Sequence, residues 1–340
     1  MTTFTDITLE AVSSVRQIAA EDWDACAHPE GSAYNPFLSY AFFAALENSG
    51  SAIARTGWAA RHLVARCEEH ILGIVPCYLK NHSQGEYVFD HNWADAFMRA
   101  GGAYYPKLQV SVPFTPVTGP RLLVRSDADQ EQIREALIAG MIGLCSQLNV
   151  SSVHVTFAAQ SEWELLKQHG FLQRTDQQYH WANENYASFD DFLATLASRH
   201  RKAIKRERRD ALTNGIDIHV LTGDAITEDA WDAFYEFYME TGSRKWGRPY
   251  LNRAFYTQIA RTMADDVVLI MAKREGRWIA GAINFVGSDT LYGRHWGAIE
   301  HHPFLHFEVC YYQAIDYAIR HGLKSVEAGA QGEHKIARGY

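Results

Sequence analysis

A polar segment close to the end of the chain, Gln331–Lys335, reads Gln-Gly-Glu-His-Lys and combines residue types that can move protons. It follows directly after an expected strand at 325–328, and ligand sites in α/β proteins favour the carboxyl ends of strands. A carboxylate or an imidazole can act as a general base, which removes a proton from an attacking nucleophile. We expect Glu333 or His334 to act as such a base. The competing interpretation is a polar turn near a terminus.

Cations and glycines flank this candidate base. Lys335 and Arg338 are expected to bind substrate, since their charges suit a phosphate group. Gly329 and Gly332 have no side chain, so the backbone amides beside them could approach a carbonyl oxygen and stabilise the negative charge that develops on it. The segment therefore offers a base, oxyanion donors and cations for an anionic substrate.

A second group of polar and aromatic residues lies between Glu86 and Lys107. Aromatic rings beside carboxylates suit a polar substrate pocket, because the rings give flat contact area and the carboxylates accept hydrogen bonds. Asp90 or Asp95 could also act as the base. The alternative is a surface loop whose aromatic side chains pack onto the domain. The residues expected to bind substrate here are Trp93, Tyr104, Tyr105 and Lys107.

A strongly basic segment runs from Arg199 to Arg209 and holds seven Lys or Arg against one Glu, although the whole chain has a formal net charge of −8. A helix would place Arg201, Lys205 and Arg208 on one face. Phosphates of a nucleotide-linked substrate, of coenzyme A or of tRNA would suit this face, so we assign Arg201 and Lys205 to substrate binding. The alternative is a solvated or intramolecular face.

The loop Ser243–Pro249 exposes Arg244, Trp246 and Arg248 between two expected helices. Loops that carry such side chains either contact substrate or pack between domains, and the sequence favours neither. We include the three residues among the candidates for substrate binding.

Neither the histidines nor the cysteines of the chain show the spacing of a metal site. The five cysteines are scattered among apolar residues, which favours reduced and buried thiols. The histidines are expected to cap helices or to lie in the core. They are His295, His301, His302 and His306, close to Glu308.

Length and composition are those of a globular protein with two domains. The chain has 340 residues, of which 47% are hydrophobic and 21% charged, and this length exceeds what one ordinary core supports. No apolar run approaches the roughly 20 residues that span a bilayer. Residues 1–10 lack the basic and apolar regions of a signal peptide. We therefore expect a cytoplasmic protein without a membrane span.

Two pairs of similar segments indicate an internal duplication. Residues 62–78 and 268–285 each read as a strand, a charged turn and a second strand with a glycine near its start. Downstream, a helix followed by a strand is expected at 130–157 and again at 303–328. Self-similarity of this two-fold kind indicates duplicated domains rather than a solenoid.

The duplication gives a first half at 1–183, a connector at 184–215 with the basic helix, and a second half at 216–340. The first half is the longer one, and we place an insertion at about 82–113. Helix N-caps are expected at Ser188, Thr227 and Asn252.

Several segments taken together resemble the FemAB-like family of predicted N-acyltransferases, labelled as peptidoglycan biosynthesis or recognition proteins. The resemblance spans nearly the whole chain, and it is the ordered set rather than any one segment that is specific. The segments are Asn35-Pro-Phe-Leu-Ser39, Gly85-Glu-Tyr-Val-Phe-Asp90, Tyr104-Tyr-Pro-Lys-Leu108, Pro113-Phe-Thr-Pro-Val-Thr-Gly-Pro-Arg121, Arg199-His-Arg-Lys202, Arg244-Lys-Trp-Gly-Arg-Pro249 and Glu327-Ala-Gly-Ala-Gln-Gly-Glu-His-Lys335.

The resemblance implies an α/β (α+β) fold of two GNAT-like acyltransferase domains in tandem, each around a mixed central sheet. It implies transfer of an acyl or aminoacyl group from acyl-CoA or aminoacyl-tRNA to an amine, such as an amino-sugar or peptide precursor of the cell wall. A GNAT-like half normally adds a strand and a helix after the strand at 325–328, so we expect the second half to be truncated.

The chain departs from ordinary GNAT acetyltransferases at the loop that holds the coenzyme A pyrophosphate. The Arg/Gln-x-x-Gly-x-Gly/Ala pattern that opens a helix toward the anion is missing at both expected places, 118–123 and 297–302. This absence also fits an aminoacyl-tRNA donor, so acyl-CoA and tRNA both stay open. The alternative to an enzyme is a non-catalytic GNAT-like module that binds a peptide or an amino sugar.

Overall fold

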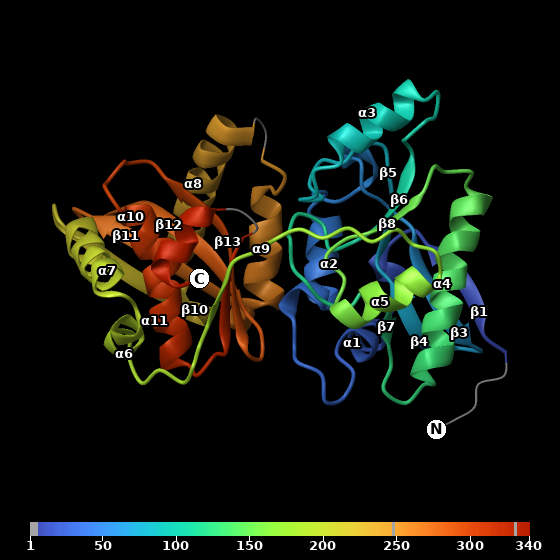
Figure 1. Cartoon of the computed structure of the whole chain (residues 1–340), viewed down its shortest axis with the longest axis horizontal. Coiled ribbons are helices and arrows are strands. Elements are labelled where there is room, and N and C mark those ends of the chain that lie inside the picture. The colour runs from blue at the N-terminus through green and yellow to red at the C-terminus, as the bar shows by residue number, and fades with distance from the viewer. Residues whose placement is uncertain (1–5, 247–248, 330–331) are drawn as a thin grey trace. The chain divides into compact units, whose positions relative to one another are not determined.

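The computed structural model describes residues 6–246, 249–329 and 332–340 (Figure 1). Within these ranges the side chains of Arg244, Lys245, Trp246 and Glu333 are not described. The chain forms two compact units, Met1–Thr175 and Asp176–Tyr340. Each unit has its own sheets, helices and hydrophobic core.

Unit 1 contains two four-stranded sheets, in the orders β1-β3-β4-β7 and β2-β5-β6-β8. Pro76 marks the point where the chain passes from one sheet to the other, because it lies between the end of β4 and the start of β5. Proline has no N–H to donate to a strand ladder, so one extended segment divides here between two sheets. The strands are β1 (Thr8–Val12), β2 (Ala59–Ala60), β3 (His62–Cys67), β4 (His70–Val75), β5 (Cys77–Lys80), β6 (Lys107–Val110), β7 (Leu123–Val124) and β8 (Val153–Val155).

The helices of unit 1 cover its sheets, and α4 packs against β3 and β4 (Figure 1). Close packing requires Gly73 on β4, because a Cβ there would lie 2.6 Å from Cγ2 of Ile133 on α4. The apolar side chains of this layer form one core cluster that includes Leu72, Leu108 and Leu137. The helices are α1 (Ala20–Ala27), α2 (Tyr40–Asn48), α3 (His91–Arg99), α4 (Gln130–Gln147) and α5 (Gln160–Gln168).

Unit 2 is built on one six-stranded sheet in the order β10-β11-β12-β13-β14-β9. All neighbours are antiparallel except β13 and β14, which are parallel. The edge strand next to β14 is β9, which comes from the start of the unit. The strands are β9 (His180–Ala182), β10 (Ile216–Thr222), β11 (Val267–Arg274), β12 (Arg277–Val286), β13 (Thr290–Ala298) and β14 (Ser325–Ala328).

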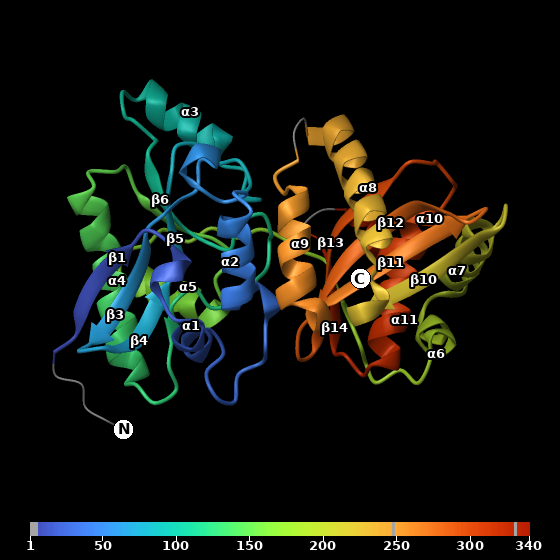
Figure 2. The same ribbon diagram turned by 180° about the vertical axis from the view of Figure 1, so that it is seen from behind.

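Helices lie against both faces of this sheet. Figure 2 shows α8 lying along β12 and β13. The approach is so close that a Cβ on Gly297 would be 2.1 Å from the carbonyl oxygen of Phe237. The helices of unit 2 are α6 (Phe189–Thr195), α7 (Ser198–Ala211), α8 (Glu228–Trp246), α9 (Arg253–Thr262), α10 (Leu305–Phe307) and α11 (Gln313–Arg320).

The predicted repeat is present in the hairpins β3–β4 and β11–β12. Gly73 of β4 lies opposite Ala65, and Gly281 of β12 lies opposite Met271 in the corresponding antiparallel pair. Each unit then joins two parallel strands through helical structure, β6 to β8 through α4 and β13 to β14 through α10 and α11. The fold is therefore the predicted tandem of mixed α/β halves.

Several local predictions can be compared with the structure directly. Ser188, Thr227 and Asn252 each accept a hydrogen bond from the backbone N–H three residues on, so the three predicted caps are confirmed. The expected helix at 303–320 is a composite of α10, a π-helical turn at Glu308–Tyr312, and α11. The expected insertion at 82–113 contains α3 but also β6, a paired strand of the sheet.

Candidate functional site

The parallel strands β13 and β14 separate in the middle of the unit 2 sheet. Their last paired residues are Gly293 and Ala328, yet β13 continues to Ala298 while β14 ends. The chain then turns at Gly329, whose φ of 73° suits a residue without a side chain. A 3₁₀ helix at Glu333–Arg338 follows. Ligand sites in α/β proteins commonly lie at the carboxyl ends of strands, so the end of β14 is a candidate site.

His334 stands in this 3₁₀ helix and is exposed to solvent. Its Nε2 lies 2.9 Å from the hydroxyl of Tyr311. Partial burial lowers the pKa of His334, and the positive charges of Arg338 and Lys335 lower this pKa further. The imidazole is therefore neutral at physiological pH and can accept a proton.

Lys335, the next residue, points the other way and is only 1% exposed. Its Nζ donates to the carbonyl oxygen of Gly329 at 2.8 Å. Burial lowers the pKa of Lys335 to about 8, and the guanidinium of Arg294 adds to this lowering. Among the side chains that the structure describes, no carboxylate pairs with Lys335.

Arg338 fixes the 3₁₀ helix to the rest of the unit. Its guanidinium donates twice to Glu207 at 3.0 Å and once to the hydroxyl of Tyr312 at 3.0 Å. It also donates to the carbonyl oxygen of His334 at 2.8 Å and lies 3.6 Å from the ring centre of Phe307. The predicted phosphate ligand is thus engaged within the protein, where it holds the backbone of His334 in place.

Three residues at this site are absent from the sequence predictions. Glu327 on β14 pairs with Arg294 on β13 at 3.1 Å, and both side chains are nearly buried. Glu207 lies in the basic helix α7 and holds Arg338. The only signal for Glu207 was its position as the single acid in a basic run, and Arg294 and Glu327 gave none.

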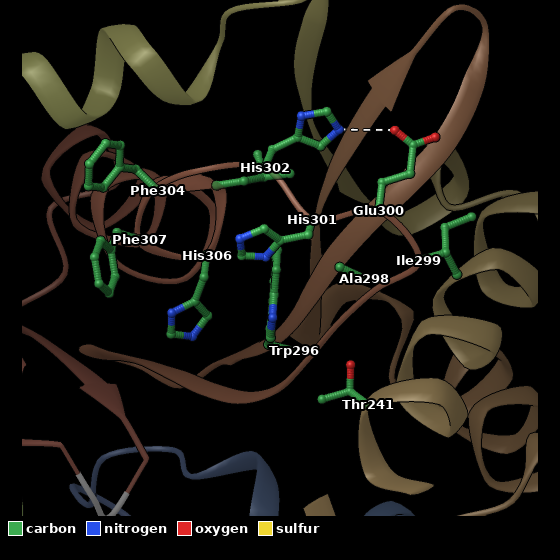
Figure 3. Close-up of a pocket in the computed structure, with 11 residues that line it drawn as sticks. Thr241, Trp296, Ala298, Ile299, Glu300, His301, His302, Phe304, His306 and Phe307 are labelled. Atoms are coloured by element: carbon green, nitrogen blue, oxygen red, sulfur yellow. Dashed lines mark hydrogen bonds and ion pairs between the residues drawn. The ribbon is translucent and has the colours of Figure 1, made fainter. Parts of the chain in front are cut away.

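A cavity of about 540 Å³ lies beside the site, where β13 ends and α10 begins (Figure 3). Its wall carries aromatic and imidazole rings, with Trp296 5.3 Å from His306 between ring centres. Phe307 connects the cavity to the site, because its ring centre lies 5.8 Å from that of His334. The lining residues are Thr241, Trp296, Ala298, Ile299, Glu300, His301, His302, Phe304, Leu305, His306 and Phe307.

The histidines of this region have structural partners. His302 lies 3.0 Å from Glu300, whose pKa is lowered to about 2 by hydrogen bonds from His302 and Arg277. Burial lowers the pKa of His295 to about 4. Among the described residues, no group of three or more His, Cys, Asp or Glu is placed to hold a metal ion.

The second predicted group is brought together in unit 1 as a buried network around Lys107. The Lys107 ammonium is fully buried and donates at 2.8 Å to Glu86 and at 2.8 Å to Asp90. Ser83 and Tyr104 donate to the same Asp90 oxygen at 2.8 Å each, and the Tyr105 hydroxyl lies 2.7 Å from Ser83. These contacts outweigh burial and lower the pKa of Asp90.

Other predicted residues lie apart from both places. Asp95 and Trp93 are exposed on α3. Lys205 is exposed and pairs with Asp190 at 2.8 Å, and Arg201 donates to the carbonyl oxygen of Ala194 at 3.2 Å. The predictions for Arg244, Trp246, Arg248 and Glu333 lie outside the described residues or side chains.

The comparisons with known proteins give one family and several structural relatives. The FemAB-like family model, described as peptidoglycan biosynthesis/recognition, matches residues 14–340. The crystal structure of FemX aligns with a TM-score of 0.54 at 13% identity, over 96% of this chain and 89% of that chain. A conserved protein of unknown function from Bacteroides thetaiotaomicron aligns with a TM-score of 0.54 at 12% identity, over 98% and 95%.

A third structure, L-PGS from Bacillus licheniformis, aligns with a TM-score of 0.51 at 11% identity, over 89% of this chain and 77% of that chain. At these identities the structural likeness shows the fold alone. No curated protein matches the chain. Within the described residues, no helix has both the length and the apolar character needed to cross a membrane.

Proposed function

Because this chain belongs to the FemAB-like family, we propose that it is an N-acyltransferase that transfers an acyl or aminoacyl group to an amine acceptor. Family membership and the GNAT-like fold support a transferase. The family description favours an amino-sugar or peptide precursor of peptidoglycan as the acceptor. Aminoacyl-tRNA and acyl-CoA are the two donor classes, and we place the reaction in the cytoplasm.

The observation that carries the proposal is an exposed, neutral imidazole near the end of β14. Histidine has an ordinary pKa close to neutrality, so an isolated one is often partly protonated and a poor base. Partial burial and the positive charges of Arg338 and Lys335 lower the pKa of His334. The lowered pKa favours the neutral imidazole, which can accept a proton.

The proposed step begins when the acceptor amine attacks the carbonyl carbon of the acyl ester or thioester. His334 takes one proton from the attacking nitrogen, and the carbonyl oxygen becomes negatively charged. The nearby charge of Lys335 stabilises this oxyanion electrostatically. The bond to the donor oxygen or sulfur then breaks, the proton from His334 goes to that leaving group, and the amide remains. The carboxylate of Asp90, predicted from sequence as a base, is engaged by Lys107, so we assign it no proton transfer.

The cavity at the end of β13 is the place that we propose for the donor. Aromatic rings such as Trp296 and Phe304 offer flat apolar faces for the base of a terminal adenosine, which both donor classes carry. The loop at 297–302 lacks the GNAT pyrophosphate pattern. This departure favours aminoacyl-tRNA, because the ester-linked end of tRNA has no pyrophosphate for such a loop to bind.

The test is acyl transfer by the purified chain, assayed with acyl-CoAs and with aminoacyl-tRNAs against nucleotide-linked amino sugars and muropeptides. His334→Gln should lower kcat by about 10²-fold or more, the usual contribution of a general base. His321→Gln is the matched control, since His321 caps the end of α11, before the start of β14, and its Nδ1 lies 2.8 Å from the carbonyl oxygen of Tyr317. Full activity of the His334→Gln variant would contradict the mechanism. Binding of an acceptor with no turnover from any donor would favour the non-catalytic module.

A further inference from the structure

Helix α3 of unit 1 carries a row of large apolar side chains in water. We name Phe89, Trp93, Phe97 and Met98 the α3 stripe. Their side chains are 53%, 50%, 46% and 50% exposed, respectively. Nowhere else in the described part of the chain do four exposed large apolar residues fall within ten positions. Clusters of this kind on a protein surface mark contact sites, whereas single exposed apolar residues need no explanation.

The geometry of the helix explains why the stripe is continuous. Trp93 and Phe97 are spaced by four residues and therefore lie one above the other along the helix, while Phe89 stands just before the helix, which begins at His91. An ordinary surface helix turns such a row toward the core. Here the helical residue that is buried is Ala94, at 4% exposed, while the aromatic row faces outward. Figure 1 shows α3 at the margin of unit 1, beyond β5 and β6.

The buried network around Lys107 holds this helix in place. Asp90 is the residue that precedes the first turn of α3, and its carboxylate is bound by Lys107 at 2.8 Å and by Tyr104 at 2.8 Å. The ring of Phe97 packs at the other end, where a Cβ on Gly102 would lie 2.3 Å from it. The start and the end of α3 are thus both tied to unit 1, so the outward direction of the stripe is a stable feature of the fold.

A cation borders the stripe. The guanidinium of Arg174 lies 5.6 Å from the ring centre of Trp93 and donates to the carbonyl oxygen of Phe89 at 3.0 Å. The one exposed acid of the helix, Asp95, comes two positions after Trp93 and therefore points to a different side, which it shares with Arg99 four positions on. Aromatic residues beside an arginine are typical of segments that lie in the interface of a membrane.

We propose that the α3 stripe inserts into the interface of a bilayer that contains anionic phospholipid. The Trp and Phe rings would lie at the level of the headgroups, and Arg174, which lies against Trp93, would meet lipid phosphates. A protein partner would need a complementary apolar groove, whereas the mixed aromatic and cationic border matches headgroups directly. The inference does not depend on the proposed transferase activity. It would, however, keep the chain beside any substrate that is anchored to lipid.

The test is flotation of the purified full chain with vesicles. The vesicles are phosphatidylcholine alone, or phosphatidylcholine mixed with phosphatidylglycerol. The unaltered chain should float with the mixed vesicles, and Phe89→Ser with Trp93→Ser should lower the partition coefficient more than about tenfold, since two half-buried aromatic contacts are lost. Ile142→Ser is the matched control, because Ile142 is 45% exposed on α4 of the same unit. Thermal unfolding of each variant establishes that it is folded.

Two further measurements separate the membrane from other occupants. Quenching of tryptophan fluorescence by brominated lipid should fall in Trp93→Phe, which keeps the apolar contact and removes this fluorophore. Arg174→Gln should weaken binding to the mixed vesicles and reduce its sensitivity to salt. Three results would overturn the proposal: no flotation of the unaltered chain, equal flotation of the serine variant, or self-association through the stripe in place of vesicle binding.

Discussion

Replacing Lys107 by Met tests the buried network of unit 1. The change removes a fully buried ammonium that donates to Glu86 and Asp90 at 2.8 Å each. It leaves the buried Asp90 carboxylate without its cation, and it leaves Glu86 with only Lys80, whose Nζ lies 4.0 Å away. Breaking a buried ion pair from one side costs about 3–5 kcal/mol, because the remaining charge cannot return to water. Unit 1 should therefore lose that much of its free energy of unfolding at neutral pH.

An exposed ion pair gives the comparison. Arg66 pairs with Glu10 in unit 1, with side chains 23% and 48% exposed. Arg66→Met should cost less than about 1 kcal/mol, since solvent already screens the pair. Urea denaturation followed by circular dichroism measures both variants. A loss in Lys107→Met no larger than that in Arg66→Met would refute the view that the network is a buried and fully charged cluster.

The pH dependence of the same variant has a definite sign. The pKa of Asp90 in the folded chain lies below its ordinary 3.8, because Lys107 and two hydroxyl groups favour the carboxylate over the effect of burial. The stabilisation from Asp90 is thus complete above pH 3.8 and is lost as the pH falls through the lower native value. Without Lys107 this stabilisation is reduced, because only the hydroxyl groups of Ser83 and Tyr104 still favour the carboxylate. The stability difference between the two proteins should therefore shrink as the pH falls below about 4.

Two other predictions follow from the unit 2 site and sheet. Acyl transfer should show a bell-shaped pH profile, because activity falls below the lowered pKa of His334 as the base is protonated and falls above about pH 8 as Lys335 loses its charge. Lys335→Arg should extend the alkaline limb to higher pH, and an unchanged profile in that variant would contradict the assignment. Gly297→Ala should destabilise the chain by at least about 1–3 kcal/mol, since the added methyl group would meet the carbonyl oxygen of Phe237 at 2.1 Å. Gly143 lies in an exposed turn of α4 with no atom within 4 Å of an added Cβ, so Gly143→Ala should stabilise the chain by up to about 1 kcal/mol. Equal melting temperatures for the two alanine variants would be evidence against this packing.

Features that depend on neighbours in sequence were predictable. The caps at Ser188, Thr227 and Asn252 follow from side-chain oxygens that reach a backbone N–H three residues away. The repeated hairpins follow from apolar patterns that recur with a glycine at the same place. The helix at 303–320 was predicted in extent, but its π-helical turn at Glu308–Tyr312 was not.

Features that depend on distant partners were not predictable. Another strand was expected after β14, whereas the strand that pairs with β14 beside β13 is β9, at His180–Ala182. A strand of three residues carries too short a pattern to indicate its partner. The grouping of residues 180–182 with the second unit likewise depends on this pairing.

For the candidate site, the sequence by itself determined the residue types: a Gly-Glu-His-Lys segment after a strand, an aromatic and acidic segment before Lys107, and a basic helix. Only the tertiary structure decided what those groups can do. Glu207 lies 131 positions from Arg338, and their ion pair fixes the backbone of His334. Lys107 meets acids 17 and 21 positions away and becomes a buried anchor for α3. Burial and charge neighbours set the state of an ionisable group, and both are properties of the folded chain.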